Sequence, residues 1–215
     1  MAVKVYVEAG KKKVFALSLA WPGWARAGKD EEAAIDALVS YAPRYAVIAS
    51  AAGLKFPARP GPVEVVERVD GDAGTDFGVP STFASTDETP PTPKELEKLV
   101  ALVATAWKLF DEASATAPES LRKGPRGGGR DRDKMVHHVI EAEAAYGRKL
   151  GVKHKPPALG DTEAITALRE DLLAALRSGE TENRWPVRYA ARRITWHVLD
   201  HLWEMEDRTD PADPA

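Results

Sequence analysis

The chain has 215 residues, of which 44% are hydrophobic and 29% are charged. These values are typical of a globular protein with enough apolar side chains for a core, and they exclude wholesale disorder. The formal net charge of -3 argues against a general nucleic-acid binder. The length fits one large domain or two small ones, and we favour two.

Cysteine is absent from the sequence. The chain therefore has no disulfide framework, no thiolate metal ligand and no cysteine nucleophile, and any metal must be bound by nitrogen or oxygen atoms. The N-terminal residues lack the continuous apolar core of a signal peptide, and no stretch is as long and apolar as a membrane span. We expect a cytoplasmic protein without a membrane partner.

The first part of the chain predicts a small α+β unit. Apolar and polar residues alternate in Val3–Glu8 and again in Val14–Leu19, which predicts a β-hairpin. Asp30 can cap a helix that follows it, and Val63–Val69 is typical of another strand. Tyr45–Ala52 is apolar and fits either a buried helix or a strand.

A change of composition marks the expected domain boundary. Between Gly71 and Pro93 the sequence is rich in Gly, Pro, Ser, Thr and Asp, which is typical of a loop or linker. We therefore divide the chain into the following parts: an α+β domain (1–72), a linker (73–91), a helical domain (92–208) and a tail (209–215).

Four helices of bundle length are predicted after the linker. Thr92, Pro93 and Glu95 combine a capping threonine, a proline at the first helical position and a capping-box glutamate, and this helix is expected to end at about Ala115. The next helices are predicted at about 131–151, 162–178 and 186–208. Connections that are mostly short favour antiparallel neighbours, so the predicted fold class is mainly α, an antiparallel four-helix bundle preceded by the α+β domain.

Two of the five histidines, His197 and His201, stand four residues apart in the last predicted helix. This spacing places both side chains on one face of the helix. The same face carries Ile194 and Val198, whereas Arg193 is expected on its flank or outside. Both imidazoles should therefore point into the bundle.

The second predicted helix offers a third inward histidine. Its apolar stripe includes Met135 and Val139; His138 borders that stripe, and His137 lies farther round. Three neutral imidazoles with open water positions make a divalent metal site that could activate a ligand or a bound water. The alternative is that the HxxxH histidines are satisfied by backbone groups or water.

These residues resemble a known pattern. The region 92–208 looks like the DinB-like superfamily of four-helix metalloproteins, which carries a histidine early in helix two and an HxxxH pair in the last helix. His138 in HHVIEAE matches the first, and His197 and His201 in WHVLDH match the pair. The ending HLWEMEDR replaces the superfamily's usual HRGQ-type ending, so the resemblance does not choose a subfamily.

The resemblance implies a function as well as a fold. It implies a three-histidine site for zinc or nickel and a metal-dependent transferase or hydrolase, most closely a thiol-dependent S-transferase that uses a low-molecular-weight thiol. A small-molecule substrate and no nucleic-acid partner follow, with a homodimer as one expected assembly. The alternatives are a non-catalytic metal-binding or stress-response protein, or a regulatory module.

The regulatory alternative comes from the N-terminal part. Its hairpin, the segment LAWPGWARAGKDEEAAIDAL and the helix within it look like the HicB-like antitoxin fold over about the first 45 residues. No DNA-binding appendix is recognisable. This resemblance implies a module that binds a partner or a ligand.

A basic, glycine-rich stretch precedes the second predicted helix. LRKGPRGGGRDRDK contains Arg126, Arg130 and Arg132 and ends close to His138, so these arginines are candidate binders of an anionic substrate. The alternative is a solvated, flexible connection. Glu143 borders the apolar stripe and is expected to form a structural salt bridge, with Arg192 or Arg193 as candidate partners, or to accept from a ligand imidazole.

Overall fold

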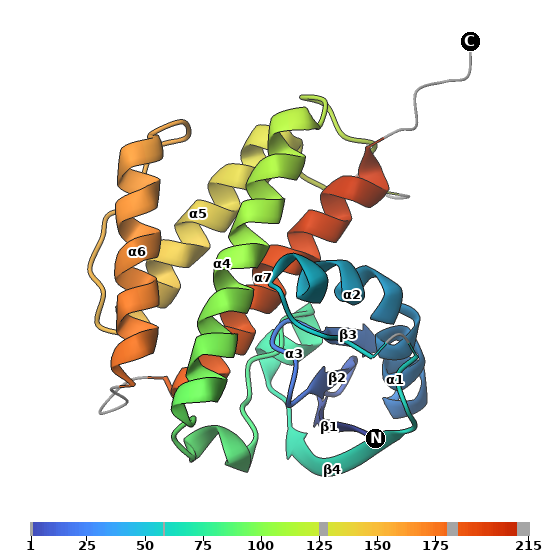
Figure 1. Ribbon diagram of the computed structural model, residues 1–215. Helices are drawn as coiled ribbons and strands as arrows, with labels where there is room; N and C mark the ends of the chain where they lie inside the picture. Colours follow the sequence, from blue (N-terminus) through green and yellow to red (C-terminus); the bar gives the residue numbers. More distant parts are fainter. Residues whose placement is uncertain (1, 58, 125–128, 180–184, 210–215) are drawn as a thin grey trace.

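The computed structural model describes residues 2–57, 59–124, 129–179 and 185–209. The α+β part contains the following elements: β1 (Val3–Ala9), β2 (Val14–Ser18), β3 (Ala25–Gly28), α1 (Glu31–Ser40), α2 (Ala42–Ala51) and β4 (Val63–Asp70). The remaining elements are α3 (Ala73–Phe77), η1 (Ser85–Glu88), α4 (Pro93–Thr116), α5 (Arg132–Lys149), α6 (Thr162–Ser178) and α7 (Val187–Arg208). A mixed sheet and a helical bundle lie side by side (Figure 1).

The sheet has the strand order β3-β2-β1-β4. β1 pairs with β2 and β2 with β3 in antiparallel fashion, whereas β1 and β4 are parallel. The predicted hairpin is confirmed as β1 and β2, and the predicted strand Val63–Val69 is confirmed as β4. The ambiguous segment 45–52 belongs to a helix, α2, and the short strand β3 was not predicted.

Successive residues of the central strands join different apolar clusters, because side chains alternate between the faces of a strand. Val5 and Ala16 belong to the large core that includes α1 and α2 residues such as Leu38. Phe15 packs instead in a smaller cluster with Trp196 of α7, at a ring-centroid distance of 6.0 Å. The sheet is therefore covered on one face by α1 and α2 and on the other by α7.

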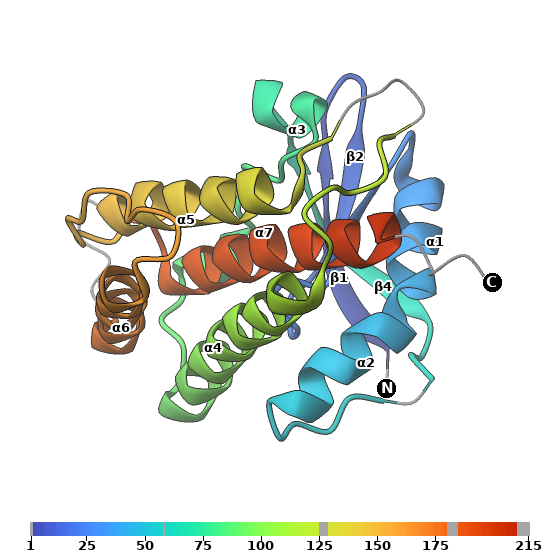
Figure 2. The same ribbon diagram turned by 90° about the horizontal axis from the view of Figure 1, so that it is seen from above.

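The bundle follows the predicted helix boundaries closely. Thr92 and Glu95 form the predicted capping box of α4, and Asp161 caps α6 by accepting from the backbone N–H of Ala164. Gly179 ends α6 with a left-handed backbone. α7 packs against both α4 and α5, so α5 and α7 are neighbours (Figure 2). α6 also packs against α4 and α5.

Helix α7 is buried on nearly all sides rather than along one stripe. Val187 to Leu199 are all buried except Arg188, because α4 and α5 cover one side of the helix and the sheet covers the other. Arg193, which was expected on the flank or outside, is only 8% exposed. That expectation is wrong, because the hydrophobic pattern was interpreted as if this side of the helix faced solvent, whereas the sheet packs against it.

The segment 73–91, expected to be a linker, contains the short helices α3 and η1. Thr75, Ala84 and Asp87 within it are buried. The large apolar cluster includes residues of both the α+β part and the bundle. Whether the two parts are independent domains stays a prediction.

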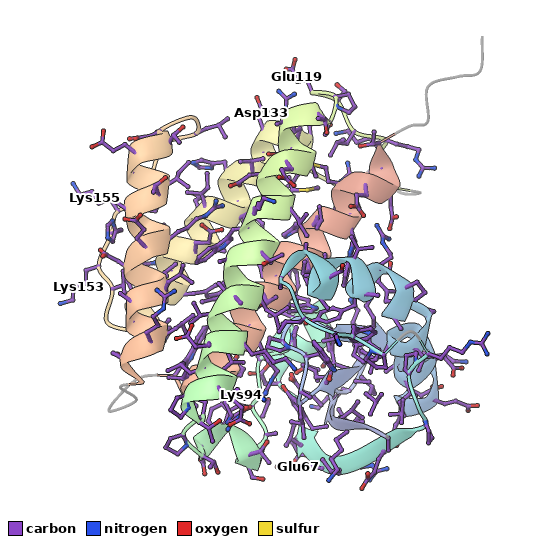
Figure 3. The ribbon with its side chains drawn as sticks, viewed as in Figure 1. Glu67, Lys94, Glu119, Asp133, Lys153 and Lys155 are labelled. Carbon is purple, nitrogen blue, oxygen red and sulfur yellow. The ribbon has the colours of Figure 1, made fainter. Side chains whose placement is uncertain are left out.

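Charged side chains lie mainly at the surface. The labelled side chains of Glu119, Lys153 and Lys155 lie on the outside of the molecule and are exposed (Figure 3). Within the described residues, no helix is long and apolar enough to cross a membrane.

Candidate metal centre

Helix α5 contributes one histidine to the bundle interior. Met135 and Val139 are fully buried on this helix, and His138 stands between them in a half-buried position. His137 lies farther round, with its side chain 47% exposed and its Nδ1 3.6 Å from the Glu141 carboxylate. The helical period thus separates an inward from an outward imidazole.

Helix α7 contributes two more histidines from successive turns. His197 and His201 are 6% and 8% exposed, and their ring centroids lie 4.8 Å apart. The His138 ring lies 5.1 Å from that of His197 and 5.0 Å from that of His201. Three imidazoles from two neighbouring helices therefore share one small volume.

The nitrogen spacing fits a metal ion. One ring nitrogen from each histidine can be chosen so that all three lie within 4.8 Å of one another, and Nε2 of His197 lies 3.2 Å from Nε2 of His138. Two imidazole nitrogens bound to zinc at about 2.1 Å with near-tetrahedral or near-octahedral angles would be about 3.0 to 3.4 Å apart. The His138–His197 pair already has this separation.

Two of the three histidines, His138 and His197, have the protonation state that a metal requires. Burial, with a smaller contribution from nearby His201, lowers the pKa of His138 to about 4 and that of His197 well below its ordinary value. Both imidazoles are therefore neutral at pH 7. Because only the neutral ring offers a lone pair, these two imidazoles can coordinate a divalent cation without first releasing protons.

Glu204 supports the third imidazole. Its Oε2 lies 2.9 Å from Nδ1 of His201, and its Oε1 accepts a hydrogen bond of 2.6 Å from Nη1 of Arg208. The hydrogen bond from His201 lowers the pKa of Glu204, so the carboxylate is charged. A Glu204 carboxylate that accepts from Nδ1–H leaves Nε2 of His201 free to face the other histidines.

Arg208 also contacts the segment that leads into α5. Its Nε donates a hydrogen bond of 2.6 Å to the carbonyl oxygen of Arg122, and the Arg122 N–H donates to the Arg208 carbonyl oxygen at 2.9 Å. Gly129 packs so closely that a Cβ there would lie 2.5 Å from Nη1 of Arg208. Arg208 therefore connects Glu204 with the approach to the helix that carries His138.

The three arginines expected to bind substrate have different positions. Arg126 lies outside the described residues. Arg130 is exposed, and its charge contributes to lowering the pKa of both His138 and His197, so it lies near the triad. Arg132 donates to the Asp133 carboxylate at 2.7 Å and to the Ala117 carbonyl oxygen at 3.0 Å, which are structural contacts.

Two carboxylates near the triad in sequence have other partners. Glu143 is 1% exposed and forms the expected buried salt bridge, but with Arg169 of α6 at 3.0 Å, so the candidate partners in α7 were wrong. Asp200 pairs with Arg26 of β3 at 2.9 Å. Neither carboxylate is bonded to a triad imidazole in these contacts.

The sequence interpretation missed two neighbours of the triad. Glu204 stands three residues after His201 on the same helix, a spacing that brings side chains together, so it could have been recognised. Tyr146 packs its ring edge-on against His197 at a centroid distance of 5.6 Å and also lies under the guanidinium of Arg193. The Tyr146 contact depends on how α5 and α7 pack, which the sequence does not specify.

Comparisons with known proteins add no assignment. The chain matches no family model, no curated protein and no solved structure.

Proposed function

We propose that this protein is a DinB-like metal-dependent enzyme of the thiol-dependent S-transferase type. The observation that carries the proposal is the convergence of His138, His197 and His201 in the bundle. A three-imidazole set with no carboxylate or thiolate among the candidate ligands suits zinc or nickel, and it leaves coordination positions for a further ligand.

The arrangement of the helices supports the same proposal. One histidine comes from the second helix of the bundle and two come from an HxxxH pair in the last helix, as in the DinB-like pattern. Helices α5 and α7 are neighbours. His138 is half-buried whereas His197 is buried, so the His138 side of the histidine group lies nearer to solvent. A site of this form is suited to a small-molecule substrate.

The residues of the site have distinct proposed roles. His138, His197 and His201 would hold the metal, and Glu204 would orient His201 through the Nδ1 hydrogen bond. A bound divalent metal would supply Lewis-acid chemistry that lowers the pKa of a thiol or water bound to it. The low-molecular-weight thiol is the proposed co-substrate.

The basic segment before α5 is the proposed substrate entrance. Arg130 is exposed near His138, so its guanidinium could attract an anionic group such as a carboxylate of the thiol or its partner substrate. Arg126 belongs to the same stretch. Arg132 already bonds to Asp133 and Ala117, which favours a supporting role for it in holding this segment against α4.

Metal content provides the first test. Purified wild-type protein should hold about one zinc or nickel ion per chain by elemental analysis, and His201→Ala should lose it. His137→Ala is the matched control, because His137 is the exposed neighbour of His138 on the same helix. Equal metal content in wild type and His201→Ala would contradict the proposed site.

Thiol binding provides the second test. In protein loaded with cobalt in place of zinc, a low-molecular-weight thiol should give a new sulfur-to-metal absorption band. The band should be absent in cobalt-treated His201→Ala. Metal binding without any thiol-dependent band would overturn the S-transferase proposal and favour a non-catalytic metal-binding protein.

A further inference from the structure

A small cavity lies between the sheet and α7, outside the three-histidine group. Its wall includes Tyr6 and Leu17 of the sheet and the residues Tyr189, Arg192, Arg193 and Trp196 of α7. About 10 Å³ is open to the centre of a water-sized particle. This is close to the smallest space that holds one such particle, so the cavity suits a single water or a small ion.

Two adjacent arginines line this cavity, and both are more than nine-tenths buried. Arg192 is 5% exposed and forms an ion pair with Asp87 of η1, which is 2% exposed. Arg193 is 8% exposed and has no ion pair with any residue that the structure describes. One of the two buried positive charges is therefore matched by an adjacent carboxylate and the other is not.

Arg193 is held by aromatic rings rather than by a carboxylate. Its guanidinium carbon lies 4.8 Å from the Tyr146 ring centroid and 4.9 Å from that of Trp196. Within the described part of the chain, its Nη1 has no hydrogen-bond partner, and neither does Nε of Arg192, whose Nη2 faces Asp87. Since arginine stays protonated in proteins, these are buried donors of charged groups with no acceptor.

The other buried acid of this region has its own donors. Glu8 is fully buried and accepts from the backbone N–H groups of Ser81 and Thr82 and from the Thr75 hydroxyl. None of the hydrogen bonds to Glu8 comes from an arginine in the part of the chain that the structure describes. Glu8 therefore fixes the segment that follows α3 and does not serve as an adjacent counter-ion for Arg193.

We propose that this cavity binds one small monovalent anion, either chloride or a carboxylate as small as formate, against Arg193. An isolated buried charge is strongly unfavourable unless a partner of opposite charge accompanies it. Cation–π contacts with two rings offset part of that cost, but they provide no acceptor for Nη1. The anion would supply both the missing charge and the missing acceptor.

The proposal does not depend on metal binding. None of the three histidines lines the cavity, and the ring of Trp196, a wall residue, lies at a centroid distance of 6.3 Å from the His197 ring. An anion that binds only the folded protein stabilises it by RT ln(1 + L/Kd), where L is the anion concentration, so Tm should rise with the logarithm of that concentration once it exceeds Kd. Metal-free wild-type protein is therefore suitable for the test.

The first experiment measures Tm against salt identity at constant ionic strength. Replacing sodium gluconate with sodium chloride should raise the Tm of the wild-type chain progressively with chloride concentration, by about 3 °C or more. Sodium formate and sodium acetate form separate arms, and the arm with the larger rise identifies a halide or a carboxylate as the preferred occupant. Equal Tm in all four salts would show that water fills the cavity and would overturn the proposal.

Two variants identify the residue responsible. Arg193→Met removes the charge and keeps an unbranched apolar stem, so it should lose the anion-dependent rise in Tm. Arg188→Met is the matched control, because Arg188 lies on the same helix and pairs with Glu95 at the surface. Retention of the full rise in Arg193→Met would contradict the assignment.

A crystallographic measurement covers the case in which Arg193→Met does not fold. Wild-type crystals soaked in sodium bromide should show an anomalous peak inside the cavity within about 3.5 Å of an Arg193 guanidinium nitrogen, the contact distance of a charged donor and a halide. A formate soak should show planar density at the same place if a carboxylate is preferred. Absence of any anion density there at saturating concentrations of both would overturn the proposal.

Discussion

The carboxylate of Glu204 links His201 to Arg208, because one of its oxygens lies 2.9 Å from the His201 Nδ1 and the other accepts from the Arg208 guanidinium at 2.6 Å. A carboxylate in this position fixes both the tautomer and the direction of the imidazole. A ring without that partner can rotate and can carry its proton on either nitrogen. The strength of metal binding should therefore depend on a residue that does not touch the metal.

Replacement of Glu204 by glutamine should weaken metal binding by about 10-fold or more, which is the usual effect of losing a carboxylate behind a ligating histidine. Competition with a chromophoric chelator measures the affinity. Glu206→Gln is the control, since its carboxylate pairs with Arg44 on α2 instead. Equal affinities for Glu204→Gln and Glu206→Gln would mean that the hydrogen bond does not orient a ligand.

A side chain at Gly129 should also disturb the Glu204 carboxylate, because it would displace Arg208, which bonds to Glu204. Its φ is +108°, and a Cβ at this position would lie 2.5 Å from Nη1 of Arg208. Gly129→Ala should therefore move the guanidinium away from Glu204 and lower metal affinity by a few-fold. It should also cost about 1 to 2 kcal/mol of unfolding free energy, because alanine is strained in the left-handed region.

Gly160→Ala separates these two effects. Gly160 has a φ of +84°, and nothing lies within 4 Å of a Cβ placed there. This variant should lose a similar unfolding free energy in urea titrations and keep wild-type metal affinity. A parallel loss of affinity in both variants would assign the effect to backbone strain rather than to Arg208.

The buried pair Glu143–Arg169 should be sensitive to the loss of one partner. Glu143 is fully buried, and its side-chain oxygens accept from Arg169, which also pairs with the more exposed Asp111. Glu143→Ala leaves a largely buried guanidinium with one remaining acid, so we expect a loss of about 3 kcal/mol in unfolding free energy.

The exposed pair Lys108–Glu112 on α4 is the comparison for this variant. Glu112→Ala should change the unfolding free energy by less than about 1 kcal/mol, because water screens an exposed ion pair. Chemical denaturation of both variants at neutral pH measures the difference. If Glu143→Ala were as mild as Glu112→Ala, the buried pair would not stabilise the packing of α5 against α6.

The sequence predicts those parts of the structure that depend on neighbouring residues. Asp161 and Gly179 bound α6 because a cap and a left-handed terminus act within one turn of the helix. His138 differs from His137 in the structure because helical periodicity is also local. The convergence of His138 with the α7 pair requires α5 and α7 to be neighbours; the sequence left this as a condition, and the packing of the two helices meets it.

The sequence does not specify how the sheet and the bundle meet. Arg193 has the polarity of a surface residue, yet α7 is covered by the sheet as well as by α4 and α5. The partner of Glu143 lies on α6, and no residue pattern in the sequence singles out Arg169 for that pair. β3 is a short strand that pairs with β2 and follows a turn, so its four residues carry too little alternation to be recognised.

The contribution of the α4 capping box to the unfolding free energy should decrease at acid pH. The hydrogen bond from Arg188, together with those from Thr92, lowers the pKa of Glu95 from 4.5 to about 2. Because the pKa is depressed in the folded state, the carboxylate stabilises the fold above the unfolded value of about 4.5, and this stabilisation is lost as the pH falls toward 2. Glu95 is exposed, so screening should limit the contribution to about 1 kcal/mol.

Comparison of wild type with Glu95→Gln tests this dependence, because glutamine keeps the shape of the side chain and does not titrate. The difference in unfolding free energy, measured by urea denaturation, should be present at pH 6 and should shrink by more than half at about pH 3, since most of the titration window between the two pKa values has then been crossed. Glu97→Gln, at an exposed position two residues along α4, should show little difference from wild type at pH 6. A difference between wild type and Glu95→Gln that stays constant with pH would mean that the cap acts through hydrogen bonding alone and not through the charge of Glu95.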